Sequence, residues 1–191
     1  MLHIKKILDD HIKLYGLKPE ISLKALSILF NCRLYEECII EVLRHYNISV
    51  KLRIVKTSNI AANARIALYI PMPNYNSIEF KNLRFVVEYN DKYATLSVDR
   101  FIYCIAHELG HVLLHSRFSP HRDSEIATDL IAMVMGFDAA YEKGRTIVTP
   151  NQSIFQSKIE SSIAGYLSEE ELSFARNYII ERRKEVNIIS K

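Results

Sequence analysis

Two histidines and a glutamate lie within five consecutive residues, His107-Glu108-Leu109-Gly110-His111. On a helix, residues four apart lie on the same face one turn from each other, so both imidazoles can bind one metal ion. Zinc accepts imidazole nitrogen in tetrahedral protein sites. Glu108 lies about 100° around the helix from His107 and can face a water activated by the metal, as a general base. The motif therefore predicts zinc ligands at His107 and His111 and a catalytic carboxylate at Glu108.

A zinc site of this kind needs a third protein ligand, and two acidic residues follow at helical spacing. Glu125 and Asp129 are four residues apart within the apolar segment 124–135. Two carboxylates on one face of such a helix are costly to bury unless a cation meets them. We expect Glu125 to bind the metal and Asp129 to orient one of the ligand imidazoles. Asp129 is the alternative third ligand, and a solvated helix face is the alternative explanation for both carboxylates.

Four further side chains carry groups that can contact a substrate. The hydroxyls of Tyr103, Tyr141 and Tyr166 are candidate donors to a tetrahedral intermediate, and the sequence does not choose among them. His121 follows the metal-binding segment in a Ser-Pro-containing stretch, where we expect an exposed loop histidine.

The elements that position these residues follow from the periodicity of the apolar side chains. A period near 3.6 predicts helices over 3–15, 21–30, 34–46, 99–116, 124–135, 152–164 and 169–186. A period of two predicts strands over 48–55, 64–70 and 83–89. Ser168 followed by Glu171 is a capping-box pattern that begins the last helix. Helices, strands and then helices indicate an α+β fold with a small, mostly antiparallel sheet packed on the helix that carries the histidines.

Composition and charge limit the remaining possibilities. The chain has 191 residues, 49% hydrophobic and 25% charged, which predicts a single domain over 1–191. Its parts are a helical N-terminal part (1–47), the sheet with the metal-site helices (48–137) and a helical C-terminal part (138–191). A net charge of +3 does not favour a nucleic-acid partner, and the helical pair within 21–46 lacks the basic second helix of a DNA reader.

The cysteines and the apolar runs indicate where the chain works. Three cysteines without a C-x-x-C pair are typical of a reducing, cytoplasmic setting. No uninterrupted apolar run approaches the ~18 residues of a membrane span, so we expect no membrane partner.

The sequence HELGHVLLH followed by E-x-A-x-D-L-x-A-x-x-x-G resembles the ImmA/IrrE-type metallopeptidases and their minimal gluzincin relatives, over about residues 65–137. The resemblance implies a zincin-like fold in which Glu125 is the third zinc ligand. The Glu125–Asp129 spacing also resembles that of thermolysin-like gluzincins, whose aspartate supports a zinc-binding histidine. The chain departs from the ImmA/IrrE pattern at Asp129, where that pattern has an aromatic residue, and at Gly136, where it has proline.

The residues and the resemblance together predict a zinc-dependent metallopeptidase, a hydrolase whose partners are protein or peptide substrates. The alternative is a non-proteolytic, zinc-stabilised zincin-fold module for interaction or regulation. The presence of Glu108 favours the enzyme, because a module without catalysis has no need of a general base. The substrate's sequence and the oligomeric state stay open.

Overall fold

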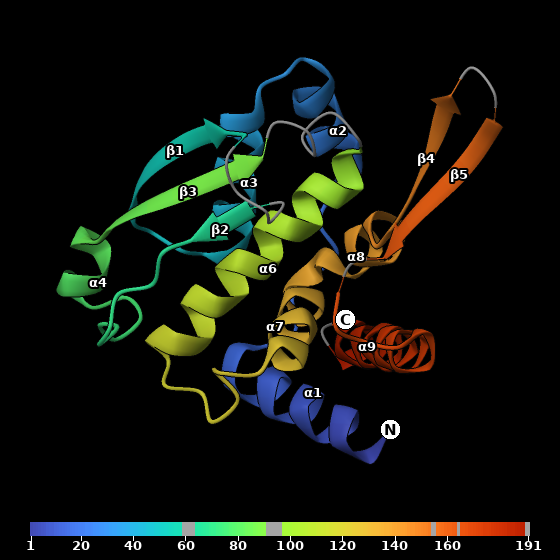
Figure 1. The fold of residues 1–191 in the computed structure, drawn as a ribbon. Helices are drawn as coiled ribbons and strands as arrows, with labels where there is room; N and C mark the ends of the chain where they lie inside the picture. The colour runs from blue at the N-terminus through green and yellow to red at the C-terminus, as the bar shows by residue number, and fades with distance from the viewer. Residues whose placement is uncertain (59–63, 91–96, 154–155, 164, 190–191) are drawn as a thin grey trace.

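The protein is described by a computed structural model covering residues 1–58, 64–90, 97–153, 156–163 and 165–189 (Figure 1). The helices are α1 (Leu2–Tyr15), α2 (Leu23–Asn31), α3 (Tyr35–Tyr46), α4 (Ile78–Asn82), α6 (Val98–Ser116), α7 (Glu125–Ala132), α8 (Asp138–Gly144) and α9 (Glu169–Ile189). A π-helical turn, η1 (Met133–Phe137), joins α7 to α8. The strands are β1 (Lys51–Thr57), β2 (Ala64–Ile66), β3 (Arg84–Asn90), β4 (Thr146–Ser153) and β5 (Gln156–Ile163).

The predicted α+β class is confirmed, with helices before and after a small three-stranded sheet. The sheet order is β1-β3-β2, in which β2 pairs antiparallel with β3 while the longer β1–β3 pairing is parallel. The prediction of a mostly antiparallel sheet is therefore wrong. A parallel pair needs a long crossover, and here the chain passes through β2 and α4 before it returns as β3. The strand predicted over 64–70 is also shorter and ends at Ile66.

The helix predicted over 152–164 is wrong, because β4 and β5 form an antiparallel hairpin there. The segment 152–164 contains four serines and the β-branched Ile159 and Ile163. Branching at Cβ restricts side-chain rotation in a helix, and serine hydroxyls compete for backbone hydrogen bonds, so both residue types are weak helix formers. The hairpin extends away from the helices in Figure 1.

The last helix begins where the capping box placed it. The Ser168 amide donates to Glu171 Oε2 at 2.8 Å, and the Glu171 amide donates to Ser168 Oγ at 3.2 Å. These two reciprocal bonds satisfy amides that the first turn of α9 leaves without helical partners.

The helix α6 lies between the three-stranded sheet and α7 (Figure 1). Its apolar side chains belong to one buried cluster that extends from Ile4 in α1 to Ile179 in α9. The Tyr46 hydroxyl of α3 donates to the Ala106 carbonyl at 2.7 Å, and Arg100 donates to the Gly144 carbonyl at the end of α8 at 3.1 Å. Hydrogen bonds to α3 and α8 therefore hold α6 in place, in addition to the packing of its apolar side chains. Among the described residues, no helix combines the length and apolar character needed to cross a bilayer.

Candidate metal centre

Both histidines of the motif lie on one face of α6. The Ser97 hydroxyl caps this helix by accepting from the Arg100 amide at 3.0 Å, which places His107 and His111 in its regular interior. Their ring centroids are 4.9 Å apart. The spacing of four residues thus brings two imidazoles side by side, as the helical period requires.

The close approach of α7 to α6 depends on Gly110, which lies between the two histidines. A Cβ at this position would be 3.1 Å from side-chain methyl carbons of both Thr128 and Ile131 of α7. Contacts this short are tighter than most carbon–carbon contacts in proteins, so the absence of a side chain lets the helices pack closely. As a result, short acidic side chains on α7 reach the imidazoles of α6.

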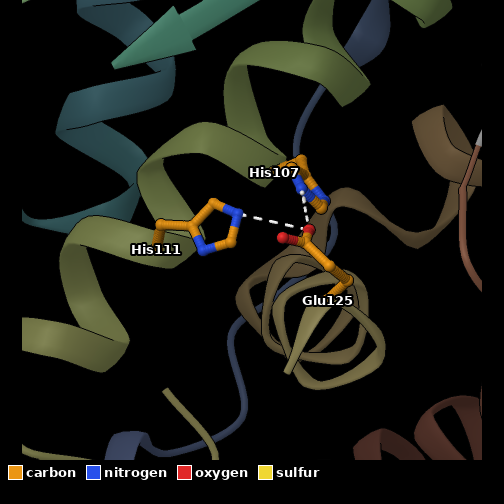
Figure 2. Close-up of side chains that lie close together, drawn as sticks. All are labelled: His107, His111 and Glu125. Carbon is orange, nitrogen blue, oxygen red and sulfur yellow. Dashed lines mark hydrogen bonds and ion pairs between the residues drawn. The ribbon is translucent and has the colours of Figure 1, made fainter. Parts of the chain in front are cut away.

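Glu125 is the first residue of α7, and its carboxylate points between the two imidazoles (Figure 2). Glu125 Oε2 is 3.1 Å from His107 Nε2 and 3.4 Å from His111 Nε2. One ligand atom from each of the three residues lies within 4.8 Å of the others. Two imidazole nitrogens and one carboxylate oxygen thus converge on one point.

Asp129 lies one turn further along α7 and is fully buried. Its Oδ1 accepts from His107 Nδ1 at 2.8 Å and from the Tyr103 hydroxyl at 3.0 Å. Its Oδ2 accepts from the Tyr141 hydroxyl at 2.9 Å and from the Tyr166 amide at 2.7 Å. Because a carboxylate only accepts, His107 must carry a proton on Nδ1, which leaves Nε2 to face the convergence point.

His111 has a support of its own that the sequence analysis missed. Thr128 Oγ1 donates to the Ser124 carbonyl at 3.1 Å and lies 3.3 Å from His111 Nδ1. With its proton committed to Ser124, the hydroxyl accepts from the imidazole and turns His111 Nε2 toward Glu125. The signal in the sequence is a threonine three residues after Glu125, on the same face of α7.

Glu108 is held by a hydrogen bond from the sheet. Its Oε2 accepts from the Ile66 amide in β2 at 3.0 Å. Burial raises the pKa of the Glu108 carboxyl above its ordinary value, against the opposing effect of His107. A raised pKa makes this carboxyl easier to protonate than an exposed glutamate.

The donor set fits zinc, which binds two histidines and one carboxylate in catalytic sites and keeps a further position for water or substrate. Burial opposes a charge on His107, but the hydrogen bonds to Asp129 and Glu125 outweigh it and raise its pKa to about 9. The hydrogen bond with His107 in turn lowers the pKa of Glu125. Asp129 and Glu125 thus stabilise positive charge at His107, whereas burial and the neighbouring His107 lower the pKa of His111 and favour the neutral imidazole that a metal binds.

The structure brings His107, His111 and Glu125 together and sets Asp129 behind His107. All four hydrogen bonds to Asp129 come from protein donors, which favours Glu125 over Asp129 as the third ligand. His121 is not part of this group, since its Nε2 pairs with Asp10 of α1 at 3.0 Å.

Comparison with known proteins adds no assignment, because no protein-family model, no curated protein and no solved structure matches the chain. The functional interpretation therefore depends on the geometry of the site and on the chemistry of its side chains.

Proposed function

We propose that the protein is a zinc-dependent metallopeptidase with a zincin-like fold that cleaves peptide bonds in protein or peptide substrates. The observation that carries the proposal is the convergence of His107 Nε2, His111 Nε2 and a Glu125 oxygen within 4.8 Å. Beside them, Glu108 is oriented separately by β2. A site that only stores or senses a metal has no need of this fourth residue, whose carboxylate neither binds the metal nor supports a ligand.

In this proposal His107, His111 and Glu125 hold the zinc ion. A zinc ion bound there supplies a Lewis acid that polarises a carbonyl and acidifies water. Asp129 and Thr128 fix the two imidazoles by accepting from their Nδ1 atoms, so that both Nε2 atoms stay directed at the ion.

Glu108 moves the protons of the reaction. The Ile66 amide holds Oε2, which leaves Oε1 to accept a proton from the attacking water. The water oxygen bonds to the carbonyl carbon, and the carbon–nitrogen bond then breaks. Glu108 returns the proton to the leaving amine, so the carboxylate ends in its starting state.

We also propose that the protein works in the cytoplasm. Cys32, Cys38 and Cys104 form no disulfide with one another in the described part of the chain. Cysteines that are not joined in disulfides are typical of a reducing compartment.

The test of the proposed function is Glu108→Gln, which keeps the size and the hydrogen bond from Ile66 but cannot accept a proton. Glu181→Gln, at an exposed position on α9, is the matched control. We expect zinc near one equivalent per chain in all three proteins. Cleavage of an unbiased peptide library is followed by mass spectrometry, and we expect its rate to fall about 10²–10⁴-fold in Glu108→Gln only. Cleavage by the wild type and by the control should stop when a zinc chelator is added.

Each other outcome contradicts a stated part of the proposal. A zinc-loaded wild type that cleaves nothing contradicts peptidase activity and favours the non-proteolytic module. Cleavage by Glu108→Gln at the wild-type rate contradicts the general-base role. Failure of the wild type to bind zinc contradicts the metal site.

A further inference from the structure

Two of the three candidate tyrosines, Tyr103 and Tyr141, already donate their hydroxyl protons to a carboxylate of the protein. The Tyr103 and Tyr141 rings are buried, with centroids 4.6 Å apart, and both hydroxyls donate to Asp129. A phenol has one proton to donate. Neither hydroxyl can therefore serve a substrate without releasing the carboxylate that orients His107.

Tyr166 is placed differently, because its main chain holds the site and its side chain stays accessible. Its amide donates to Asp129 Oδ2 at 2.7 Å. Its ring lies nearly parallel to the His107 ring, with an interplanar angle of 21° and centroids 5.9 Å apart. The residue is 56% exposed, and its phenol lies within electrostatic reach of Glu108 and Glu125. Among the described residues, none forms a hydrogen bond with its hydroxyl.

Gly165, the residue before Tyr166, allows the chain to place Tyr166 beside His107 and Asp129. Gly165 has a φ of 96°, and a Cβ there would lie 2.3 Å from the Tyr141 hydroxyl oxygen and 3.2 Å from that of Tyr103. Only glycine both adopts this backbone conformation readily and leaves room for the two phenols. The Gly165-Tyr166 segment thus lies against Asp129 and the two phenols, with the Tyr166 ring stacked beside the ring of the metal-ligand candidate His107.

We propose that the Tyr166 hydroxyl donates a hydrogen bond to the oxyanion that develops on the scissile carbonyl when water attacks. The inference rests on the proposed peptidase function and adds a catalytic residue to it. The hydroxyl keeps its own proton, while Glu108 carries the proton of the water to the leaving amine. Donors aimed at a developing oxyanion accelerate acyl transfer because they bind the transition state more strongly than the substrate.

The test is Tyr166→Phe, which removes the hydroxyl and keeps the ring and the amide that binds Asp129. We expect kcat to fall about 10²–10³-fold with KM little changed. Zinc affinity and Tm stay at wild-type values, because neither depends on the hydroxyl. The matched control is Tyr178→Phe, which removes a hydroxyl that bonds Asp9 between α9 and α1 and keeps wild-type kcat.

A second measurement does not depend on turnover. N-phosphoryl-leucyl-alanine carries a tetrahedral phosphoryl group with anionic oxygens, and its affinity is measured by calorimetry in the zinc-loaded Glu108→Gln background. We expect Tyr166→Phe to weaken its binding roughly tenfold, the equivalent of one charged hydrogen bond.

Two outcomes overturn the inference. The first is wild-type kcat with unchanged phosphoryl affinity in Tyr166→Phe. The second is a loss of zinc affinity that matches the loss of activity, which assigns Tyr166 to the support of the metal ligands instead. Failure of the proposed function has a different appearance, since the wild type itself is then inert, and the phosphoryl measurement then reports only whether the Tyr166 hydroxyl contacts an anionic tetrahedral group.

Discussion

Asp129 is the residue on which the candidate metal centre depends most. It is fully buried, and each of its oxygens accepts two hydrogen bonds from protein donors. Four accepted bonds satisfy the usual capacity of a carboxylate. The side chain therefore has no accepting position left for a metal ion, whereas Glu125 is held, as far as the described residues show, by the two imidazoles.

This difference predicts different effects of Glu125→Ala and Asp129→Asn on zinc affinity and on the stability of the metal-free protein. Glu125→Ala should remove most zinc affinity and leave the metal-free protein near wild-type stability, because that side chain is 44% exposed. Asp129→Asn should lower zinc affinity about 10–100-fold. It should also destabilise the metal-free protein by about 1–3 kcal/mol, since the amide nitrogen then faces two donors. Zinc titration against a competing chelator and urea unfolding measure the two effects.

Asp123→Asn serves as the control for these substitutions, because its side chain is 81% exposed and should tolerate the change. The reverse ranking, with zinc retained in Glu125→Ala and lost in Asp129→Asn, would transfer the ligand role to Asp129.

At the scale of elements, the turn η1 determines where α7 ends and α8 begins. Gly136 within it has a φ of 99°. The segment before α2 is tied to this turn, with the Lys18 amide donating to the Val134 carbonyl at 3.1 Å and the Ile21 amide to the Gly136 carbonyl at 3.0 Å. The turn therefore joins the metal-binding helix pair to the N-terminal helices.

Two glycines of positive φ make a matched test of this junction. A Cβ at Gly136 would lie 2.2 Å from the Pro19 carbonyl oxygen, whereas a Cβ at Gly16, with φ 74°, meets nothing within 4 Å. Gly16→Ala should cost only the strain of its backbone, about 1–3 kcal/mol, because φ 74° with ψ 160° is a conformation that residues other than glycine rarely adopt. Gly136→Ala should cost about 3 kcal/mol or more, because backbone must move as well. Equal losses of unfolding free energy in the two variants, measured with urea, would show that the contact with Pro19 does not affect stability.

At the scale of the whole molecule, α1 is anchored across the core by a buried histidine. His11 is fully buried and donates through Nε2 to the Ala127 carbonyl of α7 at 3.0 Å. Its Nδ1 has no partner among the described residues. Burial lowers the pKa of His11 to about 4, and the nearby charges are His121 and Asp10. A proton on Nδ1 would be buried without an acceptor.

The sign of the resulting pH dependence follows from linkage. The unfolded chain binds a proton at His11 with a pKa near 6.5 and the folded chain only near 4. Stability from this residue is therefore complete above about pH 6.5 and is lost as the pH falls toward 4. In metal-free protein, we expect the free energy of unfolding measured with urea to fall between about pH 7.5 and pH 5. The fall should be about 2 kcal/mol larger in wild type than in His11→Gln. Parallel losses in the two proteins would contradict this role.

The local features of the chain were predictable from sequence because they depend on neighbours within one or two turns. The helix that carries His107 and His111, the capping box at Ser168 and the α+β class all follow from spacing alone. The convergence of Glu125 with both histidines was expected from its position at the start of the next helix, and the structure brings the three together.

Tertiary structure decided which strands pair and which groups surround Asp129. The parallel β1–β3 pairing and the hydrogen bonds of Tyr103 and Tyr141 to Asp129 depend on contacts that no local period encodes. The Tyr166 amide and Asp129 are 37 residues apart, and they meet because Gly165 lets the chain lie against two buried phenols. Spacing along one helix determines which side chains share a face, whereas contacts between elements depend on how the whole core packs.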